Sequence, residues 1–236
     1  MAPLSASSLL GLWEVGRARH AIDRALLLFA AARPQWAAER LADRPLGQRN
    51  QALLELRKQT FGARIDAQAE CPACGATMAF ELQADDFLAQ AVADDAPVEF
   101  EAAGHRFRLP SSRDLAQATA EAQGDKAALA VLERCCVERP ATPCVGGLQV
   151  QAQVEDAFAR LDPLADIELS LTCASCHHAW QAPFDIASQL WDEIDARARG
   201  LLADVHALAA TYGWAEVDIL ALSEPRRAAY LAWVRP

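Results

Sequence analysis

The sequence predicts an α+β fold in which two β-hairpins, far apart in the chain, are separated by a helical insertion and flanked by helices at both ends. Three observations lead to this prediction. Two Cys-x-x-Cys pairs occur, at Cys71 with Cys74 and at Cys173 with Cys176. Apolar residues alternate with other residues on both sides of each pair, as half-buried strands require. In the remaining segments apolar residues recur at helical spacing.

Residues 1–62 are predicted to form an N-terminal helical segment. Apolar residues recur at helical spacing from Ile22 to Phe29, and this helix is expected to end before Pro34, which cannot continue it. A second helix is predicted over residues 48–60.

The middle of the chain is predicted to hold a β module and its insertion. Residues 63–110 and 164–185 form the β module, and residues 111–163 form the helical insertion. Within the first part, a further hairpin is predicted over residues 98–109. The insertion begins at Ser111, where a capping-box signature predicts the start of a helix.

Residues 186–236 are predicted to form the C-terminal helices. A long helix is expected to begin at Asp185 and to end at Gly213, because glycine commonly terminates helices. Ser223 followed by Pro225 predicts the start of a short final helix.

The polar face of the long helix carries opposite charges at i,i+4 spacing. Glu193 with Arg197, and Asp195 with Arg199, are predicted to form ion pairs worth a few tenths of a kcal/mol each. Asp192 is assigned to the same solvated face.

Length, charge and hydropathy limit the classes of function. With 236 residues the chain can form one large domain or two small ones. A formal net charge of -10 repels a phosphate backbone, so we expect protein partners and no nucleic acid. The longest apolar run, residues 25–32, is far shorter than the roughly 20 residues of a membrane helix, so no membrane association is expected. The N-terminus lacks the pattern of a secretory signal, which predicts a cytoplasmic protein with reduced cysteines.

The two Cys-x-x-Cys pairs lie in the same register of apolar residues. Counted from the first cysteine of each pair, apolar residues occupy the second, fourth and sixth positions before it and the seventh, ninth and eleventh after it. They are Ile65, Ala67, Ala69, Met78, Phe80 and Leu82 in the first copy, and Ile167, Leu169, Leu171, Trp180, Ala182 and Phe184 in the second. Two such hairpins, placed face to face, bring four thiolates around one ion.

A zinc ribbon with a helical insertion is the simplest interpretation of this pattern. Cys71, Cys74, Cys173 and Cys176 are the predicted ligands of one structural Zn²⁺ per chain, because four sulfurs form the closed tetrahedral site that zinc prefers. The interval between the pairs exceeds the usual 15 to 20 residues, but loop closure adds only roughly 1.5 kcal/mol for it. Zinc binding in small structural sites supplies on the order of 10 to 16 kcal/mol, so the free energy of metal binding greatly exceeds the added cost of closing the loop.

Several alternatives remain open at this point. The two pairs can form independent turns or carry no metal. His177 or His178 can replace one cysteine as a ligand, although four thiols suffice. The run CASCH also matches the attachment pattern of a c-type haem, but that interpretation requires export and leaves CPACG unexplained. Of the other cysteines, Cys135 is predicted to pack in a core, and Cys136 and Cys144 lack ligand spacing.

The sequence contains no pattern that requires catalysis. The motifs HExxH, GxSxG and GxGxxG are absent, as is a phosphate-binding glycine loop. His206, near Glu193 and Asp204 on the long helix, is better explained as a surface or capping histidine than as a catalytic residue. We therefore predict a protein that is not an enzyme and has no small-molecule substrate.

Aromatic residues near the C-terminus are the candidates for partner binding. They are Trp191, Trp214, Tyr230 and Trp233. Tryptophan and tyrosine are enriched in protein interfaces, although core packing is their commoner use. We expect the long helix, its terminal turn and the final helix to form a docking edge.

Four segments resemble a known family. The run WDEIDARARGLLADVHALAATYGWAEVDILALSEPRRAAYL (residues 191–231) is similar to the C-terminal signature of the baseplate (hub) protein family of contractile-tailed bacteriophages, which also occurs in prophages and related contractile injection systems. PLGQRNQALLELRKQTFG, CPACG and FRLPSSRDL fit the same family in the same order. The resemblance covers nearly the whole chain and marks His206, Tyr212, Gly213, Arg226 and Arg227 as signature positions without giving them a role.

The resemblance implies a component of a tail baseplate or hub. It implies other baseplate or tail-hub proteins as partners and the four cysteines of the two pairs as zinc ligands. The protein is then expected in the cytoplasm of a bacterial host during assembly, and afterwards in the phage tail or injection particle. One alternative is an assembly chaperone that is absent from the finished particle. Another is a host zinc-ribbon adaptor or a nucleic-acid-associated module, against which the acidic charge argues.

Overall fold

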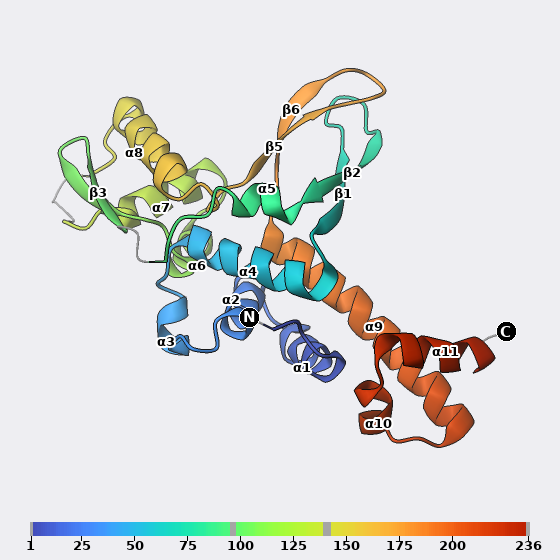
Figure 1. The fold of residues 1–236 in the computed structure, drawn as a ribbon. Helices are drawn as coiled ribbons and strands as arrows, with labels where there is room; N and C mark the ends of the chain where they lie inside the picture. The colour runs from blue at the N-terminus through green and yellow to red at the C-terminus, as the bar shows by residue number, and fades with distance from the viewer. Residues whose placement is uncertain (1, 95–97, 139–142, 235–236) are drawn as a thin grey trace.

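The computed structural model describes residues 2–94, 98–138 and 143–234, and within these ranges the fold is α+β (Figure 1). The helices are α1 (Ala6–Gly16), α2 (Ala21–Ala32), α3 (Ala38–Leu41), α4 (Leu46–Phe61), α5 (Ala84–Leu88), α6 (Ser112–Glu121), α7 (Asp125–Cys135), α8 (Leu148–Leu161), α9 (Ile186–Tyr212), α10 (Glu216–Ala221) and α11 (Glu224–Val234). The strands are β1 (Arg64–Glu70), β2 (Thr77–Gln83), β3 (Glu99–Ala102), β4 (His105–Arg108), β5 (Glu168–Thr172) and β6 (Ala179–Pro183). They form three separate antiparallel hairpins, β1–β2, β3–β4 and β5–β6.

The larger hydrophobic core lies between the N-terminal helices and α9. Helix α9 is 27 residues long and contacts α1, α2 and α4. Its apolar residues recur every three or four positions, so one face is fully buried, including Leu190, Ile194 and Leu201. In Figure 1, α9 continues past this core toward α10 and α11, which pack on its C-terminal half.

The ends of several helices are where the sequence signals predict them. The side chain of Ser111 accepts a hydrogen bond from the backbone of Asp114 and the Asp114 carboxylate accepts one from the backbone of Ser111, which is the predicted capping box. The Asp185 side chain caps α9 by accepting the Ala187 N–H. Gly213 ends α9 in the left-handed conformation, with φ of 70°.

A second, smaller core holds the β3–β4 hairpin against the helical insertion. Phe107 of β4 is fully buried with Leu132 of α7 and Val154 of α8. The β3–β4 hairpin was predicted within the β module, but it forms a sheet of its own, with a single bridge from Phe107 to Cys136 after α7 and contacts from β3 to α8. By its packing this hairpin belongs with the insertion.

One of the two predicted ion pairs of α9 forms and the other does not. Asp195 pairs with Arg199 at 2.8 Å and also accepts the indole N–H of Trp13. Glu193 does not pair with Arg197. Its carboxylate instead binds Arg57 of α4, and Arg197 binds Glu224 of α11.

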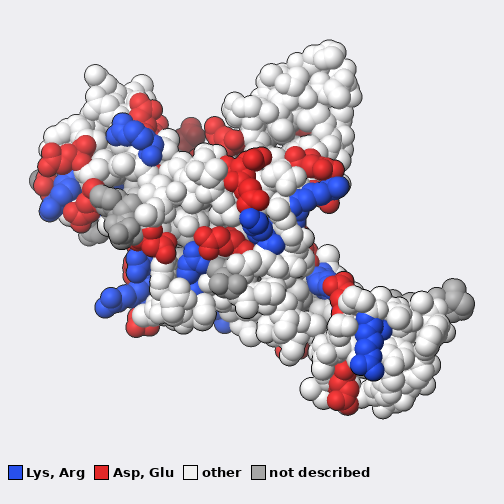
Figure 2. Space-filling model, in the orientation of Figure 1, with Lys and Arg blue, Asp and Glu red and all other residues white. Residues whose placement is uncertain are grey.

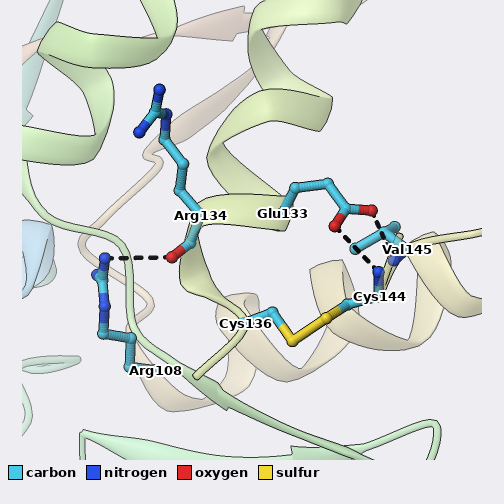
Figure 3. Close-up of a disulfide and its surroundings, with 6 residues drawn as sticks. All are labelled: Arg108, Glu133, Arg134, Cys136, Cys144 and Val145. Carbon is cyan, nitrogen blue, oxygen red and sulfur yellow. Dashed lines mark hydrogen bonds between the residues drawn. A yellow bond between two sulfur atoms is a disulfide. The ribbon is translucent and has the colours of Figure 1, made fainter. Parts of the chain in front are cut away.

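The expectation that all cysteines are reduced is wrong for one pair. Cys136 and Cys144 form a disulfide that links the end of α7 to the segment before α8 (Figure 3). The Glu133 carboxylate accepts the backbone N–H groups of Cys144 and Val145, which fixes the second cysteine beside the first. Cys135 is a free, fully buried core thiol, as predicted, and burial raises its pKa to about 12.

Candidate metal centre

The two hairpins that carry the Cys-x-x-Cys pairs are built in the same way. Strands β1 and β2 pair up to Glu70 with Thr77, and β5 and β6 pair up to Thr172 with Ala179. In each hairpin the first cysteine therefore comes directly after the last paired residue of the first strand. Both hairpins project from the same side of the molecule, and their turns lie side by side (Figure 1).

The two turns also share their backbone hydrogen bonds. In the first, Gly75 N–H donates to the carbonyl of Cys71 at 2.9 Å, and Cys71 N–H donates to Ala76 at 3.0 Å. In the second, His177 N–H donates to Cys173 at 2.9 Å, and Cys173 N–H donates to His178 at 2.9 Å. These hydrogen bonds close each turn and hold its two thiol groups close to each other.

The four sulfurs have the spacing of a metal tetrahedron. The Sγ atoms of Cys71 and Cys176 are 3.7 Å apart, as are those of Cys74 and Cys173. All four lie within 4.8 Å of one another. A tetrahedron with zinc–sulfur bonds of about 2.3 Å has sulfurs about 3.8 Å apart, whereas a disulfide bond is only about 2.0 Å long. The four cysteines therefore fit one shared metal ion. The two turns come together at this site instead of standing apart.

Backbone N–H groups stabilise thiolate in this cluster. Hydrogen bonds from the backbone of Cys176 and Ser175 lower the pKa of Cys173 to about 6. The backbone N–H of Ala76 acts in the same direction on Cys74, but Cys176, burial and the other two sulfurs together raise the pKa of Cys74 to about 12. A divalent cation bound by the four sulfurs offsets the repulsion between neighbouring thiolates, and it therefore favours the thiolate form of each cysteine.

The cluster is half enclosed and involves sulfur alone. Cys71 and Cys173 are buried, whereas Cys74 and Cys176 are exposed at the surface of the lobe that the β1–β2 and β5–β6 hairpins form. No histidine or carboxylate of the described ranges joins them as a metal-binding group. His177 and His178 precede β6 and stand outside the cluster, and His178 stacks on Trp180 at 6.0 Å. Four thiols suit Zn²⁺ or iron better than hard cations such as Mg²⁺ or Ca²⁺.

Few side chains of Asp, Glu, Lys or Arg lie near the cluster, and the nearest along the chain is Glu70, whose carboxylate lies beside Gly75 of the first turn. Residues 71–80 and 169–184 contain none of these four types. On the face seen in Figure 2, the projecting hairpins show no charged residue toward their tip, and charged residues gather at their base.

A half-open pocket of about 220 Å³ lies between the two hairpins and the start of α9, lined by Phe80 and Leu169 of the hairpins and by polar residues that include Ser188 and Asp192. None of the four cysteines lines this pocket, so the sulfur cluster joins the two hairpins separately from it, at their turns.

The candidate catalytic arrangement at His206 does not form. His206 is exposed, and the two nearby carboxylates are used elsewhere, because Glu193 binds Arg57 and Asp204 binds Arg227. The same contacts place Glu193 partly inside the fold instead of on the solvated face predicted for it.

The four candidate partner-binding aromatics fall into two groups. Trp191 belongs to the main core, with its ring against Gly16 and the Arg24 guanidinium 4.8 Å from the ring centroid, so it is not available to a partner. Trp214, Tyr230 and Trp233 lie together at the C-terminal end of the molecule. Trp214 and Tyr230 are 4.9 Å apart, Tyr230 and Trp233 are 5.7 Å apart, and Trp233 is 76% exposed.

Comparison with protein-family models, with curated proteins and with solved structures gave no match. Among the described helices, none combines the length and the apolar character needed to cross a lipid bilayer.

Proposed function

We propose that this chain is a non-enzymatic structural component of the baseplate or hub of a contractile phage tail or injection system. A structural zinc ion holds its fold, and its surfaces dock onto other baseplate or tail-hub subunits. The observation that carries the proposal is the convergence of two remote Cys-x-x-Cys pairs in one cluster, in a chain whose segments resemble that family in order.

The chemistry of the cluster favours a structural role over catalysis. A zinc ion bound by four thiolates has no open position for water or substrate, unlike catalytic zinc with three protein ligands. What the ion supplies is folding free energy, because it binds only when both hairpins are in place. Rigid positioning of contact surfaces is the function that such a centre serves.

The C-terminal aromatic cluster supports docking to another subunit. The cluster is formed by Tyr212, Trp214, Tyr230 and Trp233, whose neighbouring rings lie 4.8 to 6.0 Å apart. Aromatic side chains of this kind provide large contact areas in interfaces. The left-handed turn at Gly213 ends α9 directly after Tyr212 and directs the chain through Trp214 toward α11, which carries Tyr230 and Trp233.

Purified particles provide the first test. Quantitative mass spectrometry of tails or injection particles made with this chain should find it at a fixed copy number per particle. Its absence from finished particles, together with association with assembly intermediates, would favour an assembly chaperone instead.

A binding measurement tests the docking edge. Trp233→Ala should weaken binding to hub subunits from the same system by about tenfold or more, as truncation of a buried interface tryptophan does. Leu148→Ala is a matched control, because Leu148 is an 85% exposed apolar residue on α8, far along the chain from this cluster. Unchanged affinity of the Trp233→Ala variant, with an intact fold, would remove the aromatic cluster from the interface.

A further inference from the structure

A large groove lies at the seam between the two hydrophobic cores. Its volume is about 860 Å³, and its lining comes from α2, α4, the helical insertion and the start of α9. Ala25 and Ala187 line it from the main core, and Leu132 and Phe158 line it from the smaller core. The groove is therefore an apolar surface that joins the two cores but that the chain itself leaves uncovered.

Exposed carboxylates surround this apolar floor. They belong to Glu155, Asp156, Asp166, Glu168 and Asp185. In the part of the chain that the structure describes, none of the five forms an ion pair with a Lys or Arg side chain. The negative potential of these carboxylates attracts a cationic partner and repels an anionic one.

One buried cation faces the same groove. Arg49 lines it and is only 7% exposed. Its Nε donates to Asn50 and its Nη1 donates to Ser112, but among the described residues its Nη2 has no hydrogen-bond partner and its guanidinium has no carboxylate within ion-pair distance. This nitrogen is not fully enclosed by the protein, so it is free to donate to a carbonyl or similar oxygen of a molecule bound in the groove.

We propose that the groove binds an amphipathic helix of a partner protein, with a basic polar face. Its apolar face packs on the floor, its Lys and Arg side chains pair with the rim carboxylates, and the free carbonyls of its C-terminal end accept from Arg49. This orientation satisfies two requirements of a helix C-terminus at once, since its last carbonyls lack partners and its last turn favours basic residues. Helix-in-groove recognition of this kind is a common mode of peptide binding. The inference does not depend on the assembly in which the chain works.

Titration with synthetic peptides tests the proposal. The probe is an amidated amphipathic peptide of about 16 residues, with leucines on one face and lysines concentrated toward its C-terminal end. We expect saturable binding that weakens as salt is added, with amide shift changes in NMR spectra confined to the groove, for example at Val131, Phe158 and Ala187. An otherwise identical peptide with glutamate in place of lysine should not bind.

Charge variants locate the binding surface. Replacement of three rim residues, as Glu155→Gln, Asp156→Asn and Glu168→Gln together, should weaken binding of the lysine peptide about tenfold. The matched control removes three exposed carboxylates elsewhere, as Glu14→Gln, Glu39→Gln and Asp218→Asn, and changes the net charge equally. Equal weakening by both sets, no saturable binding, or shift changes outside the groove would overturn the proposal.

The role of Arg49 has its own test, which leaves the protein unchanged. A peptide of the same composition with its sequence reversed carries its lysines toward the N-terminal end. It should bind about tenfold more weakly, because with its lysines at the same end of the groove it presents free backbone N–H groups to Arg49 instead of free carbonyls. Equal affinity of the two peptides would overturn the orientation and the carbonyl contact assigned to Arg49.

Discussion

Gly75 and His177 occupy the same position in the two cysteine turns and adopt the same unusual backbone conformation. Each residue lies four positions after the first cysteine of its pair, and φ is 73° at Gly75 and 60° at His177. Each N–H closes its turn by donating to the carbonyl of that cysteine. The metal-binding turn therefore requires a left-handed residue, and the second copy meets this requirement with a residue that has a Cβ atom.

This relationship predicts opposite effects of two substitutions. His177→Gly should raise the free energy of unfolding by about 0.5 to 1 kcal/mol, since relief of left-handed strain exceeds the added entropy of the unfolded chain. Gly75→Ala should lower it by about 1 kcal/mol or more. Urea unfolding of the metal-loaded protein measures both. His178→Gly serves as the control, because His178 has no positive φ, and a gain there as large as at His177 would contradict the explanation.

The second prediction concerns metal content. Elemental analysis of the purified protein should find one zinc per chain, and Cys74→Ser should lose the metal together with solubility, because the two hairpins then lose their shared ligand set. Cys135→Ala is the control, since Cys135 is a buried thiol outside the cluster. A soluble, well-folded and metal-free Cys74→Ser protein would show that the cluster is not a structural metal centre.

Much of the fold follows from local patterns that the sequence displays directly. The alternation around each Cys-x-x-Cys pair predicts β1, β2, β5 and β6, and their equal register predicts that the four thiols meet. The capping box at Ser111 and the stop at Gly213 are equally local. These features depend on a few neighbouring residues, so no knowledge of tertiary contacts is needed.

Features that depend on distant contacts were missed. Glu193 has Arg197 in reach along its own helix, but Arg57 of α4 offers a buried and bidentate partner, which the sequence does not reveal. The disulfide of Cys136 and Cys144 was excluded on the grounds of cellular compartment, whereas their approach is set by tertiary packing. The short helices α5 and α10 contain too few residues for a periodic signal.

The Arg57–Glu193 pair predicts a large difference between two ion pairs of α9. Arg57 is only 4% exposed, so Glu193→Gln leaves a buried guanidinium without its counter-charge and should cost about 3 to 5 kcal/mol. Glu224→Gln breaks the more exposed pair with Arg197 and should cost at most about 1 kcal/mol. Chemical unfolding of both variants checks this contrast, and similar costs would contradict the assignment of the buried pair.

The disulfide of the insertion predicts a redox-dependent stability that is separate from the metal centre. Cys136 and Cys144 are separated by 8 positions, so Cys144→Ser should cost about 2 to 3 kcal/mol under oxidising conditions by removing a short loop constraint. In a strong reductant that does not bind zinc, the variant and the parent should have equal stability. Zinc content should be the same in both proteins, and its loss from Cys144→Ser would indicate that the two regions are coupled.

Asp114 and Asp162 are predicted to have opposite effects on acid stability. Burial alone would raise the pKa of Asp114, but hydrogen bonds from Arg108 and Ser111, with the charge of Arg108, lower it below its ordinary value of 3.8. At Asp162 burial is the largest effect and raises the pKa, although the Gly47 N–H and Arg49 oppose it.

The signs follow from linkage between protonation and folding. The stabilising contribution of Asp114 is present above its unfolded pKa and is lost as the pH falls through its folded pKa. The contribution of Asp162 is present below its unfolded pKa and is lost as the pH rises through its folded pKa. Asp114→Asn should therefore lower the free energy of unfolding at neutral pH, and Asp162→Asn should raise it, with both differences shrinking below about pH 4. Urea unfolding of the two variants and the parent at neutral and acidic pH measures these differences, and a change of the same sign for both variants would show that burial does not dominate at Asp162.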